Sequence, residues 1–137
     1  MANPTLNLAG SKESIIFGND SIVVRKYGNS LAGGRVLDVT GITATVLNAG
    51  YVIIKDANNV YKPMPVESDA YAALPEGCTY VGLLYRSILT AKPAASVLTA
   101  GVVNENALPY AISSIKTAFL TACPHIIFEP DEVVDAQ

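Results

Sequence analysis

Charged residues are scarce in this chain of 137 residues, and their scarcity limits what its surface can do. Charged side chains make up 15% of the residues and hydrophobic ones 50%, whereas an ordinary soluble domain is about 25% charged. A neutral surface rich in alanine and threonine is one explanation. The other is that further subunits cover much of the exterior, because interface cores are depleted in charge. The composition favours assembly.

Basic clusters and tryptophan are also missing. The net charge is −3 and there is no Trp, which argues against nucleic-acid binding, since that function needs a cationic surface. Four acids, Glu129, Asp131, Glu132 and Asp135, fall within the final nine residues. Without them, eight acids face nine bases, so the body is nearly neutral and residues 129–137 are expected to form a solvated acidic tail.

Long hydrophobic runs and multiple cysteines are lacking too. Residues 1–14, MANPTLNLAGSKES, have neither the cationic segment nor the apolar core of a signal peptide. No stretch approaches the roughly 20 apolar residues of a membrane span. Cys78 and Cys123 are too few for a disulfide framework and are expected to be reduced and buried. We therefore expect a protein that is made in the cytoplasm and has no membrane partner.

Groups suited to chemistry are sparse. His125 is the single histidine, and a structural role suits it better than catalysis. Cys123 and His125 offer two metal ligands where a structural zinc site needs four, and Cys78 is the one further soft ligand. Residues 32–35 lack the spacing of a phosphate-binding loop. We expect no enzyme activity, no metal and no cofactor. A glycosidase pair formed in space remains open, among the turn carboxylates Asp20, Asp38, Asp56, Glu67, Asp69 and Glu76.

What the chain does contain is a series of short β-branched runs separated by turn residues. Runs 14–17 and 21–27 flank Gly-Asn-Asp and predict a hairpin, with 28–34 as a flexible connection. Further strands are expected at 35–40, 42–47, 51–55, 60–63, 79–85 and 97–103. These runs predict a mainly β domain.

Details within these runs give sharper expectations. Ile42, Ala44 and Val46 alternate with threonines, which predicts one buried face. Pro63 and Pro65 place the strand 60–63 at a sheet edge, and residues 66–77 are expected to cross over with one helical turn. Gly82 indicates a bulge or a close approach of two backbones.

One helix is expected over about 107–122. Asn106 is the predicted N-cap, and Pro109 fits in the first turn. The apolar stripe of this helix consists of Leu108, Ile112, Ile115 and Phe119. Cys123-Pro124 should end the helix, and 126–128 should add a last strand. The expected layout is an arm and hairpin over 1–34, a β-rich domain over 35–128 and the acidic tail over 129–137.

Several short motifs carry a resemblance to a known family. They are Asn48-Ala49-Gly50-Tyr51-Val52, Tyr80-Val81-Gly82-Leu83-Leu84, Thr99-Ala100-Gly101-Val102-Val103-Asn104, and Leu108. The region 35–108 resembles phage head decoration proteins of the lambda type in these motifs. The segment 104–128 is similar to the ends of phage head-fibre proteins.

The resemblance implies a small β-barrel-like (β-tulip-like) subunit that forms a homotrimer on the exterior of a virion. Its implied partners are the major capsid protein and a further fibre protein. It also implies an N-terminal arm that orders on the shell, for which Asn3, Pro4, Leu6 and Leu8 are the candidate residues. The candidate oligomer contacts are Tyr80, Leu83, Tyr85, Leu108 and Tyr110.

Two departures from that family stand out. The decoration proteins generally lack a segment like 14–27, and many stop near the position of Leu108, so this chain is expected to be a head-fibre or combined form. The alternative function is a β-rich receptor- or carbohydrate-binding module of a surface fibre. Tyrosines would supply its stacking platforms: Tyr51, Tyr61, Tyr71, Tyr80 and Tyr85.

Overall fold

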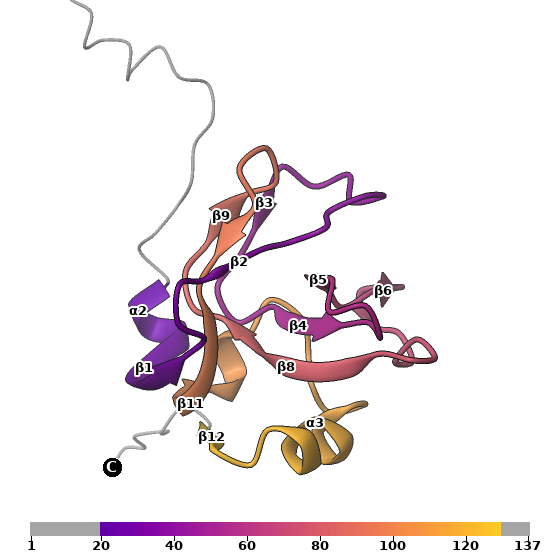
Figure 1. Ribbon diagram of the computed structural model, residues 1–137. Coiled ribbons are helices and arrows are strands. Elements are labelled where there is room, and N and C mark those ends of the chain that lie inside the picture. The colour runs from indigo at the N-terminus through magenta and orange to yellow at the C-terminus, as the bar shows by residue number, and fades with distance from the viewer. Residues whose placement is uncertain (1–19, 130–137) are drawn as a thin grey trace, which may run out of the picture.

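A six-stranded sheet organises residues 20–129, the part of the chain that the computed structural model describes (Figure 1). Five strands follow the order β1-β11-β8-β4-β5, and β12 also pairs with β11. The strands are β1 (Val24–Ser30), β4 (Val52–Lys55), β5 (Tyr61–Pro63), β8 (Thr79–Leu84), β11 (Val97–Asn104) and β12 (Ile126–Glu129). The fold is mainly β, as the sequence predicts.

Three two-stranded sheets surround this central sheet. β2 (Arg35–Val36) pairs with β10 (Ala94–Ala95), β3 (Val46–Leu47) pairs with β9 (Ile88–Leu89), and β6 (Val66–Glu67) pairs with β7 (Ala70–Tyr71). The strands of residues 20–129 do not close into a barrel. The barrel-like arrangement therefore remains a prediction.

β11 is the strand on which the fold is built. Along one side it pairs with β1, antiparallel. Along the other side, Val97 and Leu98 pair with β8, while the stretch from Gly101 onward pairs with β12 in parallel. Two partners thus share one edge of β11, and the last strand of the described chain is fixed beside a strand from its middle. The predicted strands 97–103 and 126–128 are confirmed.

Gly82 lets β8 approach β11 closely. A Cβ at this position would collide with the main-chain carbonyl of Leu98. The register between β4 and β8 also shifts after the pair Ile53–Gly82. The close approach and the irregularity predicted at Gly82 are both confirmed.

The N-terminal hairpin is predicted incorrectly where the structure describes it. Asp20–Val23 forms a short helix, α2, and the strand begins at Val24 and runs through Gly28 to Ser30. Its partner is β11, and the paired residues are 68–79 positions apart in the sequence. The other predicted strand, 14–17, lies outside the described residues. Residues 24–30 thus belong to the central sheet. The open side of β11, together with the burial of Val23 and Val24, outweighs local hairpin pairing.

The strands predicted at 35–40 and 42–47 are each reduced to two residues. The Asp38 carboxylate accepts hydrogen bonds from the backbone N–H and the hydroxyl of Thr40, and Gly41 has φ +84°. Such local bonds compete with a strand ladder. Ala44 is exposed while Leu47 is buried, so the predicted face of Ile42, Ala44 and Val46 is wrong.

The middle of the chain follows its turn residues. β4 and β5 form where expected, and β5 lies at the sheet edge, as its prolines predict. Residues 66–77 contain a hairpin, β6–β7, in place of the expected helical turn. Its two turn residues, Ser68 and Asp69, both have positive φ, which is the backbone of a type I′ turn.

The C-terminal helix is much shorter than predicted. A 3₁₀ turn, η1 (Glu105–Ala107), follows β11, and the helix α3 covers Lys116–Ala122. Asn104 caps η1 by accepting a hydrogen bond from the backbone N–H of Asn106, so the cap is not Asn106. Leu108 and Pro109 instead pack over Gly50. Of the predicted stripe, Ile112, Ile115 and Phe119 are buried, and α3 ends before Cys123 as expected.

The core lies between the central sheet and these connections. Phe119 of α3 is fully buried between the rings of Tyr80 and Phe128. The largest other side chains with less than 2% exposure come from β4, β8 and β11 and from their neighbours: Leu47, Ile53, Ile54, Met64, Leu83, Leu84, Leu98, Ile112, Ile126, Val52 and Val97.

Candidate interaction surface

The histidine and the two cysteines occupy structural positions within residues 20–129. His125 is exposed, and its carbonyl accepts a hydrogen bond from the N–H of Gly101. Cys78 and Cys123 are buried free thiols, and burial raises the pKa of Cys123 to about 11. A thiol with a raised pKa is a weak nucleophile at neutral pH. Within this range, no group of three His, Cys, Asp or Glu side chains is placed to hold a metal ion.

The predicted oligomer contacts fall in separate neighbourhoods. Leu83 is 0% exposed and belongs to the core, so it has no surface to offer a second subunit. Tyr80 packs edge-on against Phe119, and Tyr85 packs against Tyr27. Leu108 and Tyr110 contact Gly50 and Tyr51, which precede β4. Of these five residues, only Tyr85 packs against an exposed aromatic ring, that of Tyr27.

Leu108 and Tyr110 belong to a cluster that stabilises the fold. The ring centroids of Tyr51, Tyr71 and Tyr110 lie 5.7–5.8 Å apart in edge-to-face geometry. The Tyr71 hydroxyl accepts a hydrogen bond from the N–H of Val52 at 3.1 Å. Burial raises the pKa of Tyr51 to about 12 and also raises the pKa of Tyr71. Tyr51 and Tyr71 are therefore packing residues and offer no stacking platform.

A surface patch formed by Tyr27, Tyr85 and Arg86, called the aromatic patch below, is the clearest candidate for binding. The rings of Tyr27 and Tyr85 are 5.1 Å apart, and the Arg86 guanidinium lies 5.1 Å from the Tyr85 ring. Tyr27 is 48% exposed. Tyrosine and arginine are the residue types that dominate binding energy at protein interfaces. Sequence reasoning missed Tyr27, because it placed this residue in a local hairpin.

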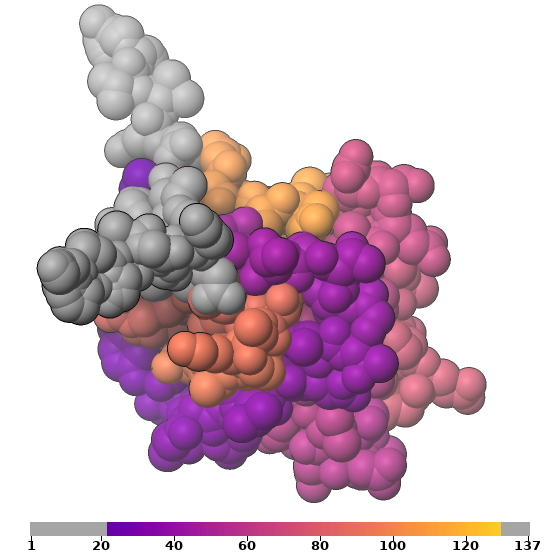
Figure 2. All heavy atoms as spheres, turned by 90° about the horizontal axis from the view of Figure 1, so that it is seen from above, coloured from indigo at the N-terminus to yellow at the C-terminus, as the bar shows by residue number. Residues whose placement is uncertain are grey.

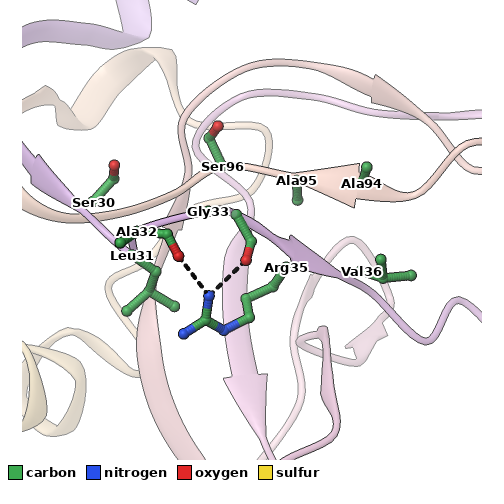
Figure 3. Close-up of a pocket in the computed structure, with 10 residues that line it drawn as sticks. Ser30, Leu31, Ala32, Gly33, Arg35, Val36, Ala94, Ala95 and Ser96 are labelled. Atoms are coloured by element: carbon green, nitrogen blue, oxygen red, sulfur yellow. Dashed lines mark hydrogen bonds between the residues drawn. The ribbon is translucent and has the colours of Figure 1, made fainter.

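A cleft of about 630 Å³ opens beside this patch, between the segments 30–36 and 94–96 (Figure 3). Most of its lining side chains are small, and Gly33 and Gly34 both have positive φ. Val36 lines it with 72% of its surface exposed. The Arg35 guanidinium donates to the carbonyls of Ala32 and Gly34, at 2.9 and 2.6 Å, so it fixes the loop that forms one wall. Sequence reasoning assigned this loop to a flexible hinge.

The cleft and the aromatic patch form one continuous face. Ser30 lines the cleft, and its hydroxyl is hydrogen-bonded to that of Tyr27 at 2.8 Å. Ser96 lines it as well, and its carbonyl accepts a hydrogen bond from the N–H of Tyr85. Figure 2 shows the segments around residues 45 and 90 side by side, where β3 pairs with β9. Such a face is suited to holding another chain and offers no acid–base pair for chemistry.

The arm residues Asn3, Pro4, Leu6 and Leu8 and the tail beyond Glu129 lie outside the described residues. Glu129 itself ends β12 and forms an ion pair with Arg25 of β1 at 3.3 Å. No helix within the described range is long and apolar enough to cross a membrane. Comparisons with protein-family models, with curated proteins and with solved structures found no match.

Proposed function

We propose that this chain is a structural virion protein that decorates the outside of an icosahedral phage capsid, or forms its head fibre, and stabilises the shell as a homotrimer. The sequence resemblance described above supports this proposal. The surface feature that carries the proposal is the exposed aromatic patch beside a cleft lined mostly by small side chains. A face of this kind is suited to contact between chains.

The mechanism is additive binding. Each trimer occupies a symmetric site where capsid proteins meet and bridges several of them. A specific interface typically buries about 1,600 Å², and attachment through three identical subunits multiplies the effect of each contact. The shell then resists the pressure of the packed genome because opening it must break many contacts at once.

Light scattering on the purified chain tests the proposed trimer. A subunit of 14.4 kDa is expected to give a species of three times that mass. In a closed ring of three, the two complementary contact surfaces of every subunit are both occupied. Replacing Tyr27 and Tyr85 with serine should shift the population to monomers, whereas Ile127→Ser, an exposed apolar position on β12, serves as the control. A stable wild-type monomer at high concentration contradicts the proposed assembly.

Deletion of residues 1–10 tests the arm. Asn3, Pro4, Leu6 and Leu8 are proposed to contact the major capsid protein, so particles should lose the truncated chain while its far-UV circular dichroism stays unchanged. Equal occupancy of full-length and truncated chains on purified particles contradicts a role for the arm.

A carbohydrate-binding module of a surface fibre is the second candidate. The exposed Tyr27–Tyr85 pair with Arg86 favours it, because aromatic rings stack on sugars as readily as on protein. Reproducible hits on a glycan array that disappear in a Tyr27→Ser, Tyr85→Ser double variant would support this function.

A further inference from the structure

Two cations flank Tyr61 on the edge strand β5. The Arg35 guanidinium lies 5.3 Å from the centre of the Tyr61 ring, and the Lys55 ammonium lies 5.9 Å from it. Lys55 and Tyr61 are paired across β4 and β5, so their side chains stand on the same face of the sheet. Neither cation has a carboxylate partner among residues 20–129, where the salt bridges are Arg25–Glu129 and Lys116–Glu105.

Hydrogen bonds hold the Arg35 guanidinium in place and leave some of its N–H donors available. One terminal nitrogen, Nη1, makes both of its hydrogen bonds, to the carbonyls of Ala32 and Gly34. The other terminal nitrogen and Nε have no acceptor within the described part of the chain. A guanidinium fixed in this way can bind a carboxylate without first becoming ordered, which lowers the entropic cost of binding. Arg35 also lines the cleft, so the charged site and the cleft are adjoining.

The chain contains a segment whose chemistry matches this site. Residues 130–137, PDEVVDAQ, carry three carboxylates around Val133 and Val134. We propose that this acidic segment from a neighbouring copy binds at Arg35 and Lys55, with its valines against Val36 in the cleft. This inference rests on the self-association in the proposed function and names its contact.

The geometry favours a neighbouring copy over the chain's own tail. Glu129 pairs with Asn104 at the end of β11, whereas Arg35 pairs with Ala95 just before the beginning of β11. The eight residues of β11 span about 26 Å at the usual rise of a strand. Asp135 is six residues past Glu129, and that length reaches about 21 Å when fully extended. A chain's own acids therefore reach the site poorly, while those of a second copy face no such limit.

Charge reversal tests the contact by mass photometry and sedimentation. Lys55→Glu is expected to raise the dissociation constant of the assembly about tenfold at low salt, and so is the triple change Asp131→Lys, Glu132→Lys, Asp135→Lys. Lys26→Glu, on β1 at the opposite edge of the sheet, is the matched control and should leave the constant unchanged. Thermal melts confirm that each variant is folded. Unchanged association in both reversed variants would overturn the inference.

A mixture of the two reversed variants separates binding between copies from binding within one chain. In the mixture, the wild-type tail of the Lys55→Glu chain can bind the wild-type site of the tail-reversed chain. Because two contacts in a ring of three can join unlike chains, association should recover in part. If the mixture stays as weakly associated as its components, the tail does not act between copies and the inference fails.

The outcomes also separate this inference from the proposed function. Tail-dependent association of a chain that is absent from purified virus particles would keep the contact and remove the virion role. A chain that occupies particles and forms trimers even with its tail reversed would keep the virion role and remove the contact.

Discussion

At Gly82 the side-chain hydrogen leaves room for the carbonyl of Leu98, and no larger residue does. Gly82→Ala should therefore lower the free energy of unfolding by about 3 kcal/mol, the upper end of the usual cost of overpacking a core position. Gly77→Ala is the control, since its Cβ meets nothing within 4 Å, although its positive φ costs about 1 kcal/mol. Urea denaturation measures both variants. Equal losses would show that β8 does not need the close approach.

Tyr71 stabilises the fold through its buried hydroxyl. Tyr71→Phe removes the acceptor of the Val52 N–H and leaves a buried donor unpaired, which should cost about 1–3 kcal/mol. Tyr27→Phe loses a hydroxyl that is hydrogen-bonded at the surface and should change the free energy of unfolding by less than about 0.5 kcal/mol. Thermal or urea unfolding compares the two variants, and the reverse ranking would contradict this assignment.

Buried phenols and a buried thiol make the fold sensitive to alkali. Burial raises the pKa of Tyr51 to about 12 and that of Cys123 to about 11, from ordinary values of 10.0 and 9.0. The unfolded chain therefore loses these protons at lower pH than the folded chain does. The stabilisation is complete below about pH 9 and is lost progressively as the pH rises toward 12. Urea midpoints between about pH 8 and 11 should fall, and a flat profile would contradict the burial of these groups.

At the scale of the element, the hairpin β6–β7 has the right backbone but not the best residues for it. Ser68 and Asp69 have φ values of 54° and 64°, where Asn-Gly is the favoured pair. The double variant Ser68→Asn, Asp69→Gly should raise the free energy of unfolding by about 1 kcal/mol. Asp69→Val, a β-branched residue at positive φ, should lower it by a similar amount. Chemical denaturation of both variants checks the signs, and a stabilised valine variant would contradict the turn assignment.

The elements that can be predicted from the sequence are those in which the local pattern of apolar residues matches their burial in the fold. β4, β8 and β11 are apolar runs that become mostly buried or half-buried strands, and β12 buries Ile126. β5 lies at the edge because Pro63 and Pro65 cannot donate to a ladder. Tertiary contacts account for the failures. Residues 108–115 are not helical, and Leu108, Pro109 and Tyr110 pack over Gly50 and Tyr51. β1 pairs with a distant strand. The local spacing of apolar residues does not reveal that these segments contact residues far away in the sequence.

The sequence also identified some residues of the candidate surface and missed others. Sequence reasoning singled out Tyr85, and it correctly placed Cys78 and Cys123 among buried residues. It missed Tyr27 and the cleft, because both depend on β1 and β2 meeting β11 and β10. Leu83 was chosen as a contact from the motif that contains it, yet that strand is central and its leucine is buried. A motif can mark a family resemblance without marking a surface.

At the scale of the whole molecule, the proposed role depends on shape and on contacts between chains. Its described part holds eight basic and eight acidic residues, so long-range electrostatic steering is weak and local contacts decide binding. The aromatic patch, the cleft and the cation pair at Tyr61 are the features through which such a subunit would be held by its neighbours.

Electron microscopy of purified phage particles, made with and without this chain, tests that role most directly. We expect three-fold density on the outer surface where capsid proteins meet, present with the chain and absent without it. Particles that carry no such density, and that lack the chain by mass spectrometry, would contradict the proposed virion role.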